Sequence, residues 1–137
     1  HENYSDRKFA AHVGLYESLV DSMYFPYIRP QENGYHTDTR WLKLLDESGN
    51  GIQIEANKTI CFSALPNPYE DFQGNSVAYK ESRHTIDIPN REGVFLHLDH
   101  SQRGLGGDDS WGAQPHEQYL LNESSYEYGF SVSPLEK

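Results

Sequence analysis

The segment best suited to chemistry is a glycine-rich loop over residues 103–112, which reads RGLGGDDSWG. Its glycines can adopt a positive φ or let the backbone approach another group closely. Trp111 follows them at once, and a flat apolar ring with a polar edge suits the C–H face of a sugar. The residue types alone leave two interpretations open: Trp111 binds a ligand, or it packs within the domain.

Three carboxylates, Asp99, Asp108 and Asp109, lie close together in the sequence. Such a group could bind calcium, or act as the acid and base that flank a glycosidic bond. Adjacent side chains usually point apart, however, so Asp108 and Asp109 make a poor catalytic pair. The pattern favours a structural role, in which these carboxylates accept hydrogen bonds from the backbone N–H groups of a tight loop.

Other motifs in the sequence are incomplete. Residues 46–51 begin like a calcium loop, but Asn57 stands where a bidentate glutamate is needed, so a hairpin turn is predicted instead. The seven histidines show no zinc spacing and are expected to be surface or hydrogen-bonding residues. Cys61 is the single cysteine, and its apolar neighbours predict a buried position on a strand.

Composition limits the partners of the chain. A net charge of -10 over 137 residues disfavours nucleic acid and anionic membrane surfaces, whereas a neutral sugar meets no such repulsion. Eighteen aromatic residues (ten Tyr, six Phe and two Trp) indicate a folded chain. We expect one domain over residues 1–137, with an irregular lead-in over residues 1–34. The first residue is not Met and no signal peptide is visible, so we expect a piece of a longer protein, whose location (cytoplasm or periplasm) stays open.

Alternating apolar and polar residues predict the elements that would position the loop. Strands are expected over residues 37–44 and 52–56, joined by the turn at 46–51. Further strands are expected over residues 59–64, 94–98, 117–121 and 126–133, and the one expected helix covers residues 76–84. Short strands separated by turns, with little helix, indicate an all-β fold, an antiparallel β-sandwich.

Three stretches, read in order, resemble a known family. They are YIRPQENG at residues 27–34, Arg40-Trp41-Leu42, and the loop from Gly104 to Gly112, with weaker matches from about residue 4 to residue 132. These stretches are similar to the C-terminal domain of LacZ-type β-galactosidases, glycoside hydrolase family 2.

The resemblance implies a galactose-mutarotase-like supersandwich, of which this chain would form roughly the second half. It also implies a retaining hydrolase of terminal β-galactosides such as lactose. The two catalytic glutamates and the Mg and Na ligands would lie on a barrel domain outside this sequence, so this chain alone is expected to be inactive, with no catalytic or metal-binding residue of its own. Trp111 would contact the sugar on the aglycone side, and its loop would be supported by Gly106, Gly107, Asp108, Asp109 and Ser110.

Three functions follow as hypotheses. The first is an accessory domain of a β-galactosidase, with the upstream domains of the same enzyme as partners and self-association left open. The second is a stand-alone carbohydrate-binding module that uses the same tryptophan. The third is a structural or interface domain. The start without Met favours the first over the second.

Overall fold

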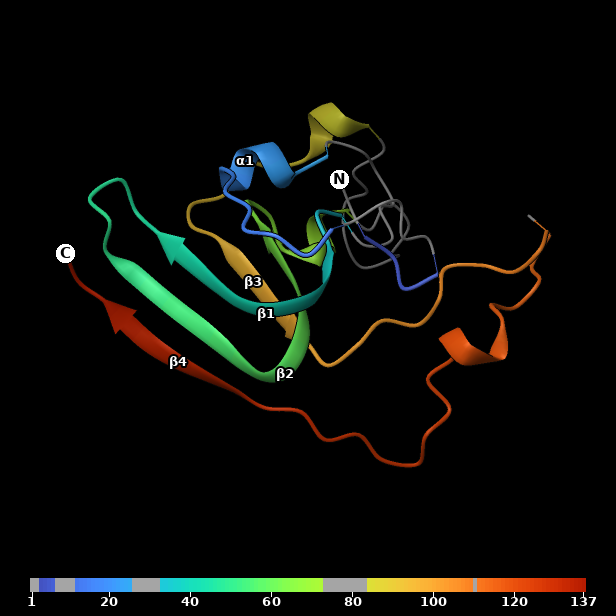
Figure 1. Cartoon of the computed structure of the whole chain (residues 1–137). Helices are drawn as coiled ribbons and strands as arrows, with labels where there is room; N and C mark the ends of the chain where they lie inside the picture. The colour runs from blue at the N-terminus through green and yellow to red at the C-terminus, as the bar shows by residue number, and fades with distance from the viewer. Residues whose placement is uncertain (1–2, 7–11, 26–32, 73–83, 110) are drawn as a thin grey trace. The chain divides into compact units, whose positions relative to one another are not determined.

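The computed structural model describes residues 3–6, 12–25, 33–72, 84–109 and 111–137 (Figure 1). Their regular elements are α1 (Val20–Met23), β1 (His36–Leu45), β2 (Gly51–Leu65), β3 (Phe95–Asp99) and β4 (Phe130–Leu135), with the 3-10 helices η1 (Tyr69–Phe72), η2 (Thr85–Asp87) and η3 (Glu117–Tyr119). None of the described helices is long and apolar enough to cross a membrane. Strands dominate, which confirms the prediction of an all-β fold.

The four strands form one sheet. β2 lies between β1 and β3, and β4 also pairs with β2. Both β1 and β4 run antiparallel to β2 and pair with its first residues, so they lie on opposite sides of it (Figure 1). This mostly antiparallel arrangement agrees with the expected sandwich-like class.

The turn between β1 and β2 is held by one side chain. The Asp46 carboxylate accepts hydrogen bonds from the backbone N–H groups of Ser48 and Asn50, both at 2.9 Å. Gly49 has a φ of 87°, a conformation that favours glycine. These contacts confirm that the segment is a hairpin turn, in which Asp46 bonds to the backbone.

The prediction of separate strands over residues 52–56 and 59–64 is wrong, because β2 is continuous over 15 residues. Between the pairs Thr39–Ile60 and Trp41–Glu55, β1 advances two residues and β2 advances five. The additional residues of β2 bulge out of the pairing. A second shift in register on β1 coincides with Asp38, whose φ is 57°. The break seen in the sequence is thus a bulge within one bent strand.

Two other predicted strands differ from the structure, whereas the strand expected at 94–98 is confirmed as β3. The strand expected at 117–121 is wrong, because the backbone there closes the local turns of η3: the Tyr119 N–H bonds to the His116 carbonyl at 2.8 Å. The strand expected from residue 126 begins only at Phe130. The helix expected over residues 76–84 lies outside the described residues, apart from His84.

The chain divides into two compact units, each with its own buried side chains. One unit draws on residues 1–3, 9–35 and 63–97, and the other on residues 4–8, 36–62 and 98–137. The first buries Asn33, Tyr35, Ser63, Ala64, Leu65, Asn67 and Phe72; the second buries Leu42, Ile54, Ile60 and Cys61. The buried thiol of Cys61 on β2 is as predicted.

A polar clasp fixes η1 in the first unit. The Arg91 guanidinium donates two hydrogen bonds to the Asp71 carboxylate, at 2.8 and 2.7 Å. The buried Asn67 amide donates to Asp71 at 2.9 Å and to the Pro89 carbonyl at 2.7 Å. The hydrogen bond from Arg91 lowers the pKa of Asp71 most; burial opposes this, and Asn67 and the charge of Arg91 lower the pKa further.

Replacement of Asp71 by Asn tests this clasp. At pH 7 the neutral amide should lower the free energy of unfolding modestly, because the Arg91 side chain is 47% exposed and solvent screens the pair. Since the folded pKa of Asp71 is lowered, its contribution is complete above the unfolded value, about 3.9, and is lost as the pH falls through the folded value. Urea unfolding should therefore show a difference at pH 7 that shrinks as the pH falls below about 4.

The exposed neighbour Glu92 offers a control, since Glu92→Gln removes a carboxylate without touching the clasp. It should leave the unfolding curve nearly unchanged at either pH. An effect of Asp71→Asn that stayed constant from pH 7 to strong acid would contradict the ionic origin of the stabilisation.

Candidate functional site

The glycine-rich loop belongs to the second unit and closes on itself through its backbone. The Gly104 N–H donates to the Tyr119 carbonyl at 2.7 Å, and the Gly107 N–H donates to the Ala113 carbonyl at 3.1 Å. These two bonds join the beginning of the loop to the chain that follows it. The described part of the loop therefore has a defined shape although it contains no strand.

A distant side chain supports the same loop. The Asp6 carboxylate accepts hydrogen bonds from the backbone N–H groups of Leu105, at 3.0 Å, and Gly106, at 3.3 Å. Asp6 could not be recognised from the sequence as a support of the loop, because it lies 99 positions from Leu105. No local motif marks such a long-range contact.

The glycines of the loop have different roles. A Cβ atom at Gly104 would lie 2.8 Å from the Cβ atoms of both Pro115 and Tyr119, which is closer than packing allows. A Cβ atom at Gly107 would meet the Gln114 carbonyl. A Cβ atom at Gly106 would have no neighbour within 4 Å. Close approach of the backbone therefore explains Gly104 and Gly107, whereas the space around Gly106 is open.

The two aspartates of the loop make separate contacts. Asp109 accepts hydrogen bonds from the backbone N–H groups of Trp111, at 2.8 Å, and Ala113, at 3.3 Å. Asp108 instead contacts the His116 ring nitrogen Nε2 at 2.7 Å, and both side chains are largely exposed. Asp109 thus shapes the backbone on either side of Gly112, while Asp108 presents a polar pair at the surface. Ser110 lies outside the described residues.

Trp111 is the most exposed large apolar side chain of the described residues. It is 92% exposed, compared with 47% for Trp41 on β1. Its backbone is nevertheless fixed by Asp109, and the next residue, Gly112, has a φ of 107°. The loop therefore presents a whole indole ring to solvent on a constrained base.

A polar recess of about 230 Å³ lies beside the first half of the loop. It is lined by Asp6, Gly106, Gly107, Asp108, His116, Gln118 and Tyr119. An exposed aromatic ring and a polar recess on one loop suit the binding of a ligand that has both apolar and hydrogen-bonding surfaces.

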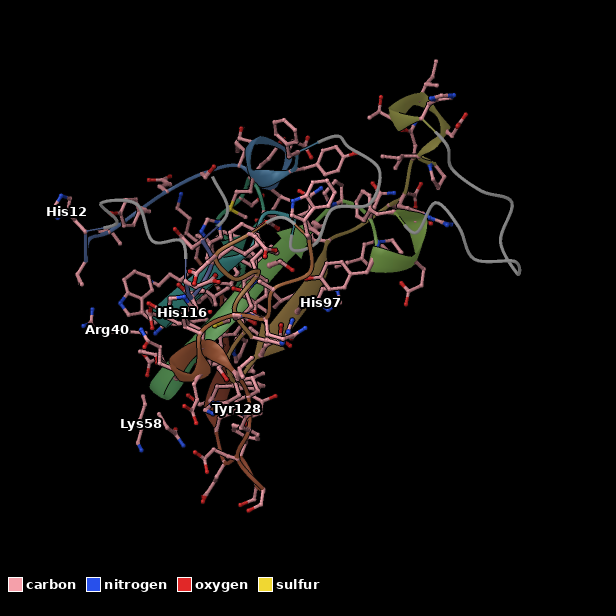
Figure 2. All side chains as sticks on the ribbon, turned by 90° about the vertical axis from the view of Figure 1, so that its right-hand side faces the viewer. His12, Arg40, Lys58, His97, His116 and Tyr128 are labelled. Carbon is pink, nitrogen blue, oxygen red and sulfur yellow. The ribbon has the colours of Figure 1, made fainter. Side chains whose placement is uncertain are left out.

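Other histidines pack against tyrosine rings. His97 on β3, which is labelled in Figure 2, stacks on Tyr69 in the first unit, with ring centroids 4.0 Å apart. In the second unit, His100 lies 5.4 Å from Tyr126 and 5.5 Å from Tyr128, again between ring centroids. These contacts give the rings a packing role that the sequence pattern did not predict. Across the part of the chain that the structure describes, no group of three or more His, Cys, Asp or Glu residues could hold a metal ion.

Comparison with known proteins gives one family and several relatives. The family model described as the beta galactosidase small chain matches residues 1–132. A beta-galactosidase from Streptococcus thermophilus is 35% identical over 136 residues, which are 98% of this chain and 13% of that protein. One from Priestia megaterium is 38% identical over 136 residues, 98% of this chain and 12% of that protein. Beta-galactosidase BgaC from Bifidobacterium adolescentis is 36% identical over 123 residues, 88% of this chain and 11% of that protein. The chain therefore spans only about an eighth of the length of these relatives.

The packing around the loop predicts that alanine destabilises the fold at Gly104 and is tolerated at Gly106. Gly104→Ala should lower the free energy of unfolding by about 1–3 kcal/mol, because the added methyl group overlaps Pro115 and Tyr119. Gly106→Ala is the matched control, since its methyl group meets no neighbour within 4 Å, and it should change stability by less than about 0.5 kcal/mol. Urea unfolding followed by tryptophan fluorescence measures both, and equal effects of the two variants would refute the close approach at Gly104.

Proposed function

We propose, because this chain belongs to the beta galactosidase small chain family, that it forms an accessory domain of a longer β-galactosidase and supplies one wall of its sugar site. The family match confirms the resemblance seen in the sequence. The longer enzyme would hydrolyse terminal β-galactosides such as lactose, and the upstream domains of the same polypeptide would be the partners of this one.

The observation that carries the proposal is the exposure of Trp111 on a constrained loop. An indole ring that is 92% exposed contributes little to packing. The backbone that carries it is nevertheless held by Asp109 and by the positive φ of Gly112, which favours contact of the ring with something outside the unit. Sugar rings offer a C–H face that stacks on such a surface. We assign Trp111 to the aglycone side of the bond that is cleaved, with the loop residues 106–110 as its support.

The remaining chemistry is assigned to other parts of the longer enzyme. The two glutamates of the retaining reaction, and the Mg and Na ions implied by the family, would lie on a barrel domain. The charge of -10 supports a neutral ligand for this chain over an anionic one. Within the loop, Asp109 is bonded to backbone N–H groups and Asp108 to His116, which suits binding and support more than proton transfer.

Replacement of Trp111 by Ala in the full-length enzyme tests the proposal. The loss of the stacking surface should weaken sugar binding by an amount on the order of 1 to 3 kcal/mol. The loss should appear in KM for lactose and in transfer to an acceptor sugar, because the ring would not contact the reacting carbon. The stability of the domain should change little, since the ring is exposed.

Trp41→Ala provides the matched control. Trp41 is also a partly exposed tryptophan of the second unit, but it lies on β1 rather than on the loop. It should leave KM for lactose within about twofold, less than the effect of one lost hydrogen bond. If Trp111→Ala unfolds the domain while KM stays normal in the surviving enzyme, the ring has a structural role and the proposal is wrong.

The chain by itself should neither hydrolyse a chromogenic galactoside nor bind galactose or lactose tightly. One aromatic platform is a small part of a sugar site, and the other polar contacts would come from the upstream domains. Turnover above that of a mock preparation would reveal a catalytic site in this chain. A micromolar dissociation constant by calorimetry would instead support a stand-alone carbohydrate-binding module.

A further inference from the structure

The polar recess beside the loop combines residues of the tryptophan loop with residues from outside it. Gly106, Gly107 and Asp108 form one side of it, and His116 and Gln118 come from the chain that returns after the loop. The recess thus shares the Gly106–Asp108 backbone with the tryptophan loop, and Trp111 follows Asp108 by only three positions. Because the Gly107 N–H bonds to the Ala113 carbonyl, the recess lies at the base of the short loop that carries Trp111.

The groups at the recess suit hydroxyl groups. Asp108 is 87% exposed and His116 57% exposed, so their paired polar side chains are open to solvent. Gln118 is also exposed, and its amide can both donate and accept hydrogen bonds. A sugar hydroxyl also does both, so it can satisfy a carboxylate, an imidazole and an amide in turn.

The charges at the recess favour a neutral ligand. Both oxygens of Asp6 accept hydrogen bonds from backbone N–H groups, and Asp108 is bonded to His116, so both carboxylates already have hydrogen-bonding partners. The two carboxylates would repel an anion. A volume of about 230 Å³ lies below the roughly 300–1,000 Å³ usual for pockets that bind drug-sized ligands, so one small unit fits better than an extended molecule.

We propose that this recess is a subsite for a second sugar unit beyond the cleaved bond, adjacent to the unit that lies on Trp111. The inference rests on the proposed function, because it extends the same aglycone side. Galactosides with two sugar units in the leaving group, and disaccharides as acceptors in transfer, would then gain contacts with His116 and Gln118. Lactose, which has a single sugar unit there, would not reach them.

The experiment compares two substrates in the full-length enzyme: lactose and the trisaccharide in which galactose is β-linked to the galactose of lactose. His116→Ala and Gln118→Ala should each raise KM for the trisaccharide about three- to tenfold, as expected for one lost hydrogen bond, while KM for lactose stays within about twofold. His116→Asn, which keeps a hydrogen-bonding side chain, should raise KM for the trisaccharide much less than His116→Ala does. Glu117→Gln lies on the same turn but outside the recess, and it should change neither value.

Trp111→Ala, measured beside these variants, separates the two proposals. If it raises KM for both substrates while the recess variants change neither, the subsite is wrong and the proposed function stands. Recess variants that raise KM equally for both substrates would also overturn the subsite. If Trp111→Ala changes neither KM but the recess variants selectively weaken the trisaccharide, the recess binds sugar and the role given to Trp111 is wrong.

Discussion

The close approach of the backbone at Gly104 is the contact on which the tryptophan loop depends. No side chain larger than hydrogen fits between this residue and the Cβ atoms of Pro115 and Tyr119. The approach places the Gly104 N–H 2.7 Å from the Tyr119 carbonyl, and Asp6 bonds to the next two N–H groups. Packing and hydrogen bonds with distant parts of the sequence therefore fix the base of the loop, independently of the contacts that its tip makes.

This fixed base explains how an exposed indole can be useful for binding. A ring on a flexible loop would lose conformational freedom when a ligand binds, which lowers affinity. Asp109 already holds the backbone N–H groups of Trp111 and Ala113, and Gly107 bonds to Ala113, so less freedom remains to be lost. The recess borders the base of the same loop, as the proposed subsite for a second linked sugar unit requires.

Sequence patterns predicted the parts of the structure that depend on local rules. The alternation before Leu45 and the Asp46 turn were recognisable because strand faces and hairpin turns follow from neighbouring residues. The bulge in β2 was not recognisable from the sequence, because a register shift depends on the partner strand. For the site, Trp111 stood out by its type and place, whereas the support from Asp6 and the steric role of Gly104 arise from residues brought together only by the fold.

The most direct measurement of the central claim is the structure of the full-length enzyme with a galactoside bound beyond the cleaved bond. We expect the indole of Trp111 to lie flat against the C–H face of the aglycone sugar, at a carbon–carbon separation of about 4 Å. We also expect the Gly104 and Asp6 contacts to be retained. A structure in which the ring of Trp111 packs into a protein interface, and the sugar is held entirely by other residues, would contradict the role assigned to Trp111.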